Sequence, residues 1–304
     1  MKILVTGGAG FIGKRLVERL DGDWDNEIRV IDNYTEQVHG IIPDSKDQPH
    51  RDITSDDTWK ELKHFQPDVI YHLASDTGTG QSMSDTTRYL TNNLIGTAKL
   101  LDFISNLSTQ PRVILTSSRA VYGEEENHIN TVPIPRSIYG LTKLVQEQMF
   151  SIMDNSNYTF LRLQNIYGPG QSLNNPYTGL ISIFTKQLDL NQNVEVWDDG
   201  KPTRDFLYID DAVDAIIRSR TDKTIGKTYD IGTGEGTPVI DVANKLKELL
   251  DSSGTVSKSS WHRPGDILHA VSESNYLFKR DTNWKCRVSI DDGLSKLIQW
   301  YKEL

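Results

Sequence analysis

The feature that most constrains this chain is TGGAGFIGKR, residues 6–15, in which Gly7, Gly10 and Gly13 are spaced three residues apart. The preceding KILV is typical of a short buried parallel strand, and the following FIGKRLVERL has the apolar period of a helix. Glycines in such a strand-to-helix turn let backbone N–H groups and the helix N-terminus approach a pyrophosphate. The turn therefore predicts a dinucleotide site, with a purely structural tight turn as the alternative.

The order of the apolar segments predicts the fold class. We expect strands at KILVT, EIRVID, DVIYHLA, RVILTSS and TFLRLQN, alternating with helices at FIGKRLVERL, NNLIGTAKLLDFIS and IYGLTKLVQEQMFSIM. This alternation predicts an α/β fold with a doubly wound parallel (Rossmann) sheet and helices on both faces. We expect an NAD-binding domain over residues 1–165 and a smaller, interwoven substrate-binding region over 166–304. A segment near 205–235 is expected to return to the first domain.

Charge and composition disfavour several classes of binding partner. The chain has 33 basic and 42 acidic residues, a net charge of −9, which disfavours nucleic acid and anionic membranes and favours a small molecule. The single Cys286 cannot form an internal disulfide, and no Cys or His pair has zinc spacing, so we expect no metal site. With no long apolar stretch and no signal-peptide core, we expect a cytoplasmic protein.

An acidic residue follows the second expected strand. VIDN places Asp32 nineteen residues after Gly13, where a carboxylate can bind the adenosine ribose hydroxyls of a dinucleotide. Its negative charge would repel a 2′-phosphate, so NAD is favoured over NADP. A helix-capping role for Asp32 is the structural alternative.

A tyrosine and a lysine form the candidate chemical centre. Tyr139 and Lys143 in YGLTK lie four residues apart on one face of an expected helix. A neighbouring ammonium favours the phenolate, which would make tyrosine a usable base near neutral pH. Such pairs also occur by chance on helix surfaces. The hydroxyls of TSS, residues 116–118, end an expected strand and could share a substrate hydrogen bond with Tyr139.

With these motifs in order, the whole chain resembles the extended short-chain dehydrogenase/reductase family, specifically its nucleotide-sugar epimerases and dehydratases. TGGAGFIG, SSRAVYG, YGLTK, NIYGPGQ, DGKPTRDFLYIDD and RPGD carry the resemblance. It implies Ser118, Tyr139 and Lys143 as the catalytic set. It also implies an NAD site made by Gly7, Gly10, Phe11, Ile12, Gly13, Asp32, Asn33, Asp52, Ile53, Leu73, Ala74, Asn93, Tyr139 and Lys143. The implied substrate contacts are Thr77, Ser118, Asn165, Trp197, Arg204 and Arg263, with a core role for Trp197 equally open.

Two residues after Ser118 bear on which reaction of this family to expect. Dehydratases of this family place Asp-Glu where this chain has Arg119 and Ala120, which cannot serve as general acid and base, so redox chemistry at C4 of a hexose is expected. HLASDTGTGQSM and NPYTGLISIF resemble a bacterial subgroup that acts on dTDP-6-deoxyhexoses. We expect an NAD-dependent 4-epimerase acting on a sugar such as dTDP-L-rhamnose, or alternatively a dTDP-4-keto-6-deoxyglucose reductase. UDP-galactose epimerases have a lysine near the position of Thr77 that helps to retain NAD. Because this chain has a threonine there, the reductase remains an alternative.

Two further expectations follow from the resemblance. Some proteins of this fold are non-catalytic nucleotide sensors, but the presence of Ser118, Tyr139 and Lys143 disfavours that role here. Family members often form homodimers through a four-helix bundle that includes the helix with the Tyr/Lys pair. The apolar residues of that helix, Leu141, Leu144, Val145 and Met149, could serve either this interface or the core.

Overall fold

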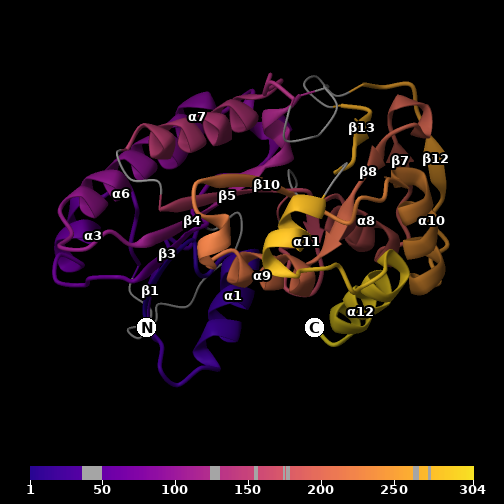
Figure 1. Ribbon diagram of the computed structural model, residues 1–304. Helices are drawn as coiled ribbons and strands as arrows, with labels where there is room; N and C mark the ends of the chain where they lie inside the picture. The colour runs from indigo at the N-terminus through magenta and orange to yellow at the C-terminus, as the bar shows by residue number, and fades with distance from the viewer. Residues whose placement is uncertain are drawn as a thin grey trace.

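The computed structural model of the protein describes residues 1–35, 50–123, 131–153, 157–173, 175, 179–262, 267–272 and 275–304. The strands of its central sheet are β1 (Lys2–Thr6), β2 (Glu27–Ile31), β3 (Val69–His72), β4 (Arg112–Ser118), β5 (Tyr158–Leu163) and β10 (Lys227–Ile231). They lie in the order β10-β5-β4-β3-β1-β2, and every neighbouring pair is parallel (Figure 1). The predicted doubly wound parallel sheet is confirmed.

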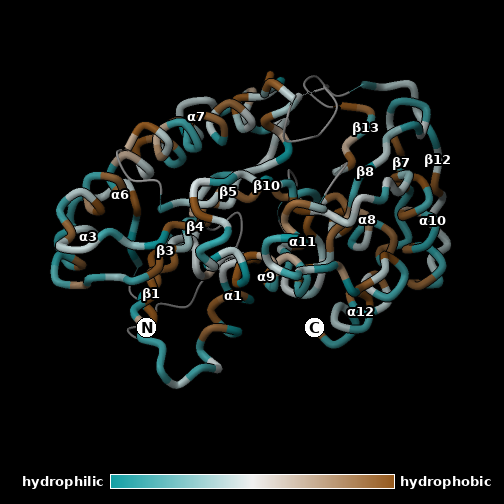
Figure 2. Tube along the Cα trace, in the orientation of Figure 1, coloured by the Kyte–Doolittle hydropathy of each residue, from teal (hydrophilic) through white to brown (hydrophobic). Residues whose placement is uncertain are grey.

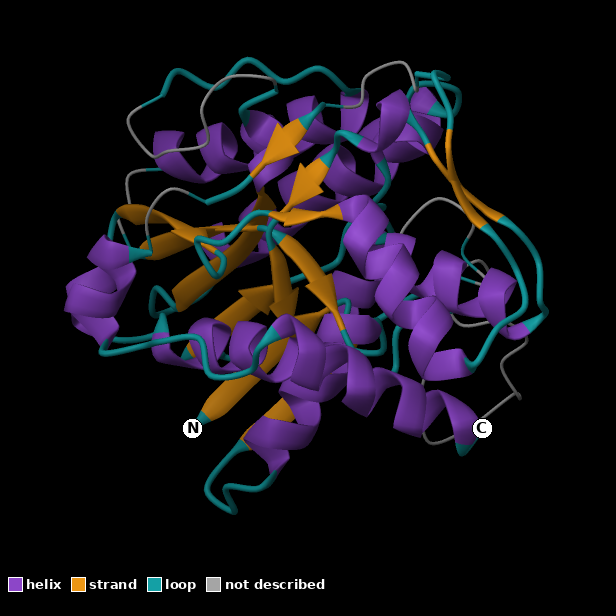
Figure 3. Ribbon diagram, turned by 90° about the vertical axis from the view of Figure 1, so that its right-hand side faces the viewer, coloured by secondary structure: helices purple, strands orange, loops and turns teal. Residues whose placement is uncertain are grey.

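Helices cover both faces of this sheet (Figures 1 and 3). On one face lie α1 (Phe11–Asp21) and α9 (Ile209–Arg218), whose buried apolar residues join a single core cluster with the strands. On the other face lie α3 (Asp56–Glu61), α6 (Gly96–Ser105) and α7 (Ile138–Ile152), which supply a second cluster. A strand between two such layers is buried on both sides, which explains the continuous apolar runs in the sequence.

The alternation of side chains along β1 shows how one strand serves both cores. Ile3 and Val5 belong to the cluster beneath α1, whereas Leu4 belongs to the cluster beneath α6 and α7, and all three are fully buried. Successive side chains of a strand point to opposite faces, so a short apolar run is enough to fix β1 in the sheet centre. Figure 2 shows this strand and its neighbour β3 as hydrophobic segments inside the molecule.

The C-terminal half builds a second region beside the sheet, on the right in Figure 1. Its helices are α8 (Leu180–Asp189), α10 (Val239–Leu250), α11 (Tyr276–Thr282) and α12 (Ile290–Lys302). Its short strands are β6 (Asn165–Tyr167) paired with β9 (Phe206–Tyr208), β7 (Val194–Val196) paired with β12 (Val256–Lys258), and β8 (Thr203–Arg204) between β11 (Thr237–Pro238) and β13 (His269–Ala270). Within the described ranges, no helix has the length and apolar character needed to span a bilayer.

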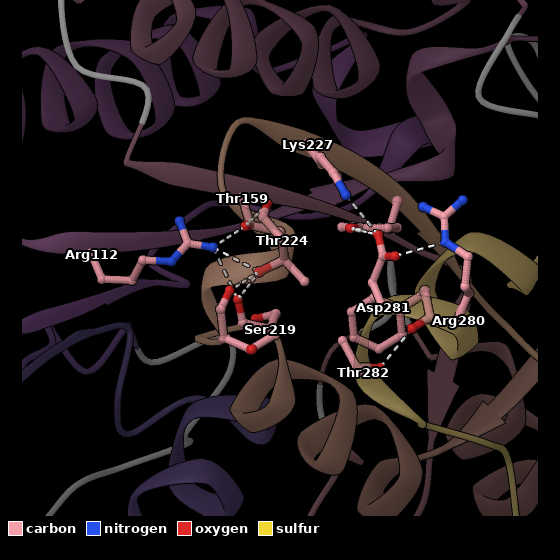
Figure 4. Close-up of polar contacts among 11 residues, drawn as sticks. Arg112, Thr159, Ser219, Thr224, Lys227, Arg280, Asp281 and Thr282 are labelled. Carbon is pink, nitrogen blue, oxygen red and sulfur yellow. Dashed lines mark hydrogen bonds and ion pairs between the residues drawn. The ribbon is translucent and has the colours of Figure 1, made fainter.

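Two polar clusters attach segments of this half to the amino-terminal end of the sheet (Figure 4). The guanidinium of Arg112, at the start of β4, donates to the Thr159 hydroxyl of β5, to the Ser219 carbonyl (3.0 Å) and to the Thr224 hydroxyl (2.8 Å). The Asp281 carboxylate of α11 accepts from Lys227 of β10 at 2.9 Å. These contacts explain how β10, distant in sequence, forms the outer strand beside β5.

One expected helix is longer and less regular than its sequence pattern indicates. The segment expected over 92–105 begins earlier, as α5 (Thr86–Tyr89), continues through a π-helical turn at Leu90–Ile95 and ends as α6. A π-helical turn inserts one residue into the α-helical repeat and is frequent at functional sites. Asn93 lies in this turn and is fully buried.

The sheet order defines where a ligand can bind. The chain passes from β1 to β2 on one side, then crosses to β3 on the other side of β1, so the strand order reverses between β1 and β3. In open parallel sheets, ligands bind beyond the carboxyl ends of the strands at such a reversal. Thr6 and His72 end the two strands concerned.

Candidate active site

A cavity of about 500 Å³ lies at the carboxyl ends of the central strands. Most of the residues expected to bind cofactor or substrate line it: Gly7, Gly10, Phe11, Ile12, Gly13, Asp32, Asn33, Ile53, Leu73, Ala74, Thr77, Ser118, Tyr139, Lys143, Asn165 and Arg204. Asp52, Asn93 and Trp197 are not among the lining residues, and Arg263 lies outside the described residues. One cavity thus joins the glycine turn to the Tyr/Lys pair.

The glycine turn has the geometry of a dinucleotide cradle. Gly7 has a φ of +71°, and a Cβ on it would lie 2.6 Å from the Ala74 nitrogen, so only glycine fits. A Cβ on Gly13 would lie 2.0 Å from the Gly7 carbonyl oxygen, so the helix packs directly on the turn. A Cβ on Gly10 would meet only that oxygen, at 3.3 Å, which leaves room beside the N-terminus of α1. These residues fit the pyrophosphate of a dinucleotide.

Asp32 directly follows β2 beside this turn, and its buried carboxylate accepts from backbone donors. Its Oδ2 accepts from the Ala9 nitrogen at 2.9 Å and its Oδ1 from the Tyr34 nitrogen at 2.8 Å. Asn33 lines the cavity next to it and donates to Asp52 Oδ2 at 3.4 Å. Asp52 therefore supports the cavity wall through Asn33, and the Asp32 carboxylate has the fixed position needed to bind a ribose.

Helix α7 begins where it can present Tyr139 to Ser118. The Ser137 hydroxyl caps the helix by accepting from the Gly140 nitrogen at 3.1 Å. A Cβ on Gly140 would lie 2.4 Å from the Ala120 carbonyl oxygen, so glycine lets the helix approach the turn that follows β4. Tyr139, in the first turn, lines the cavity together with Ser118, and the Ser118 hydroxyl is close enough to influence the pKa of the phenol. The two hydroxyls can therefore share one substrate oxygen.

The electrostatics of the pair differ from the simple expectation. Burial raises the pKa of Tyr139, and the nearby Ser118 hydroxyl offsets part of this shift. Lys143 is buried and donates from Nζ to the Thr116 carbonyl at 2.9 Å. Burial lowers the pKa of Lys143 to about 7, although the charge of Glu147 opposes the shift. In the protein alone, desolvation therefore dominates the pKa of Tyr139, and the phenol stays protonated at neutral pH.

Asn93 acts behind the cavity wall instead of lining it. Its Nδ2 donates to the Thr142 hydroxyl of α7 at 2.9 Å, and its Oδ1 accepts from the Asp76 nitrogen at 2.8 Å. The Asn93 carbonyl accepts from Gln146, also on α7, at 3.1 Å. The buried asparagine thus links the loop after β3 to the helix that carries Tyr139 and Lys143.

Asn165 and Arg204, two of the expected substrate contacts, line the side of the cavity that the C-terminal half forms. Asn165 follows β5 and donates to the Asp205 carbonyl at 3.3 Å, and Arg204 donates to the Leu268 carbonyl at 3.1 Å. Trp197 packs edge-on against Trp261, with ring centroids 4.2 Å apart, instead of facing the cavity. That pairing follows from the adjacent strands β7 and β12.

Several lining residues were not among those expected from the sequence. They include Asp76, Arg136, Gln164, Gln171 and Asn175. Gln164 stands out because it is buried at the carboxyl end of β5. Its signal in the sequence is a polar residue directly after a buried strand, next to Asn165. Arg119 also lines the cavity, and its guanidinium donates to the Gly123 carbonyl at 2.9 Å. Among the described residues, no three His, Cys, Asp or Glu side chains gather as a metal site.

Comparisons with known proteins agree with this geometry. The model of the NAD dependent epimerase/dehydratase family matches residues 3–232. A dTDP-L-rhamnose 4-epimerase from Burkholderia thailandensis is 32% identical over 345 residues, covering 98% of this chain and 94% of that protein. The UDP-glucose 4-epimerase structure from Thermotoga maritima with UDP-glucose has a TM-score of 0.90 at 27% identity, covering 100% of this chain and 99% of the other. The Thermus thermophilus UDP-glucose 4-epimerase complex with NAD has a TM-score of 0.86 at 26% identity, covering 99% of both chains.

Proposed function

This chain belongs to the NAD-dependent epimerase/dehydratase family, and we propose that it is a 4-epimerase of a dTDP-linked 6-deoxyhexose such as dTDP-L-rhamnose. It is an NAD-dependent enzyme of nucleotide-sugar metabolism. The observation that carries the proposal is that Ser118, Tyr139 and Lys143 line the same cavity as the glycine turn. The 32% sequence identity to the dTDP-L-rhamnose 4-epimerase of Burkholderia thailandensis supports the choice of sugar.

In the proposed epimerase reaction, Tyr139 and Ser118 have different roles. NAD would be held by the glycine turn and Asp32, and it would supply the hydride acceptor and a positive charge that favours the phenolate of Tyr139. Tyr139 would take the C4 hydroxyl proton while Ser118 holds the same oxygen, which would leave a 4-keto sugar. After the keto sugar turns over and the hydride is returned to its other face, Tyr139 would give the proton back to the C4 oxygen. Arg119 and Ala120, which follow Ser118, supply no carboxylate pair for elimination of water.

A 4-ketoreductase is the second candidate, and it rests on Thr77. This residue lines the cavity with an exposed side chain that has no charge to hold a dinucleotide phosphate. Its carbonyl accepts from the Tyr89 hydroxyl at 2.7 Å, so its backbone is fixed. A position without a charge to hold the dinucleotide suits an enzyme that exchanges its dinucleotide at each turnover.

An isotope experiment separates the two reactions. We expect dTDP-L-rhamnose to be converted into its C4 epimer with only catalytic NAD, because the hydride removed from C4 returns to C4 of the same molecule. The product, separated by chromatography and analysed by mass spectrometry, should retain deuterium placed at C4, and both epimers should give the same equilibrium mixture. Consumption of one NADH for each dTDP-4-keto-6-deoxyhexose, with no reaction of dTDP-L-rhamnose, would establish the reductase.

We also propose that the protein is a homodimer. On the outer face of α7, Leu141 is 41% and Ile152 is 82% exposed. On the neighbouring helix, Leu90 is 38% and Ile95 is 50% exposed. Two adjacent helices with apolar outer faces match the two-helix contribution of each copy to a four-helix bundle. Light scattering should give twice the chain mass, and Leu141→Glu with Ile95→Glu should give a folded monomer. A monomeric wild-type protein would contradict this proposal.

A further inference from the structure

The part of the cavity beside Asp32 contains a cation, Arg51, that was not among the expected cofactor residues. Arg51 lines the cavity together with Asp32 and Ile53, and its side chain is 26% exposed. Its Nε donates to Glu61 Oε2 at 2.9 Å. Among the residues that the structure describes, its two terminal guanidinium nitrogens make no hydrogen bond. This accessible guanidinium is therefore available to a ligand.

The contacts of Arg51 place its charged end close to the residues that follow β2. The Arg51 nitrogen donates to the Asp32 carbonyl at 2.8 Å, which brings the two backbones together. Burial and the Asp32 charge raise the pKa of the Tyr34 phenol, and the Arg51 charge lowers it, so the guanidinium lies near both groups. Glu61, the last residue of α3, holds Nε of the same guanidinium.

The two side chains that line the cavity here suit a planar ring. Arg51 and Ile53 line it, whereas Asp52 between them does not. A Cβ on Gly96, at the start of α6, would lie 2.3 Å from Ile53 Cδ1, so Ile53 packs directly on that helix. A planar cation beside a fixed apolar side chain fits a nucleobase, because bases have apolar faces and attract guanidinium groups.

The other parts of NAD already have fitting residues. The pyrophosphate fits the turn that contains Gly7 and Gly10, and the adenosine ribose fits the fixed carboxylate of Asp32. The base attached to that ribose is the part of NAD that remains for Arg51 and Ile53. A 2′-phosphate at this position would meet the Asp32 charge, which disfavours it.

We propose that the Arg51 guanidinium packs on the adenine ring of NAD, with Ile53 as the apolar wall beside it. Glu61 holds the guanidinium through Nε before the cofactor binds, so less side-chain freedom is lost on binding. The inference concerns the cofactor. It is therefore independent of which sugar is converted, and of whether the reaction is that of an epimerase or of a reductase.

Arg51→Met tests the proposal, because methionine keeps an apolar side chain but removes the charge and the planar group. After removal of any bound dinucleotide, we expect calorimetric titration to show about fivefold to tenfold weaker binding of NAD than the wild type, the usual effect of a lost cation–π contact. The affinities for AMP and for NADP should fall by the same factor, because both contain adenine. Arg51→Lys can keep the ion pair with Glu61, but it should recover only part of the affinity, because an ammonium group is not planar.

Glu61→Gln is the matched control, because it removes the ion pair and keeps the guanidinium. Its affinity for NAD should stay within about twofold of the wild type, and its melting temperature close to it, since an exposed ion pair contributes little. Arg29→Met controls for the loss of one positive charge. The Arg29 side chain is 57% exposed, pairs with Glu27 at 3.2 Å and does not line the cavity, so this variant should bind NAD as the wild type does.

The outcomes also separate this inference from the proposed sugar reaction. If Arg51→Met leaves the binding of NAD and AMP unchanged, or if Glu61→Gln weakens NAD as much as Arg51→Met does, the inference is overturned. If Arg51→Met weakens NADP more than NAD, or if Arg51→Lys restores the full affinity, Arg51 binds a phosphate and the inference is overturned as well. None of these results changes the outcome of the isotope experiment on the sugar, and failure of the 4-epimerase proposal leaves the titrations with NAD valid.

Discussion

Replacement of Tyr139 by phenylalanine is expected to lower turnover by at least about a hundredfold, the usual contribution of a positioned general base. The change removes one oxygen from a residue that lines the cavity together with Ser118. Among the described residues, the Ser118 oxygen accepts from the Ala120 nitrogen at 3.2 Å, and no other side-chain hydroxyl is bonded to it that could replace the phenol. The C4 proton would then have no acceptor at the reacting centre.

The measurement is the steady-state rate with saturating sugar nucleotide, together with the affinity for NAD. Tyr158→Phe is a suitable control, because Tyr158 stacks on Phe160 with a centroid distance of 4.5 Å at the opposite end of β5. That variant should keep the wild-type rate. If Tyr139→Phe folds, binds NAD and still turns over at nearly the wild-type rate, another residue must take the proton.

The residues expected to bind the dinucleotide could be placed in one cavity because they lie in short contiguous motifs. Gly7, Gly10 and Gly13 lie where β1 turns into α1, and Asp32 directly follows β2. The carboxyl ends of parallel strands meet at one edge of the sheet, so the order of the motifs along the chain is sufficient to place them together. The same reasoning brought Ser118 to the cavity, because it ends β4.

The tertiary contacts that support the catalytic helix could not be predicted in this way. Asn93 and Thr142 are 49 residues apart in the chain, and their contact depends on a π-helical turn that the apolar pattern does not reveal. Trp197 turns to Trp261 because β7 pairs with β12, another long-range contact. Gln164 was counted as a strand residue, since its burial and missing partners are visible only in three dimensions.

The spacing of Tyr139 and Lys143 also gave the wrong direction for the pKa of the tyrosine in the protein alone. The sequence shows that the two side chains share a helix face, but not how deeply they are buried. In the structure, burial raises the pKa of Tyr139 and lowers that of Lys143. Motifs therefore predict which groups belong to a site, whereas the protonation of these groups depends on packing.

The second large effect that we expect is a loss of protein stability when a buried ion pair is broken. In this pair, Glu147 of α7, the helix that carries Tyr139 and Lys143, contacts Arg162 of β5. Arg162 donates to the two carboxylate oxygens at 3.0 Å and 2.7 Å, and the Ser117 hydroxyl of β4 donates to the same carboxylate. The side chains are 8% and 6% exposed. Arg162 also donates to the Tyr122 hydroxyl at 2.7 Å. This network joins α7 to two central strands.

Glu147→Leu should therefore lower the free energy of unfolding by about 3–5 kcal/mol, because it leaves the Arg162 charge buried without its partner. Urea unfolding without ligands measures this change. The double variant Glu147→Leu with Arg162→Met should recover part of the loss, since the Arg162 charge no longer lies buried without the Glu147 carboxylate. A loss below about 1 kcal/mol in the single variant, the range of exposed ion pairs, would show that water reaches Arg162. Because the Glu147 charge raises the pKa of Lys143, the single variant should also lower that pKa further, which ties the stability of α7 to the chemistry it carries.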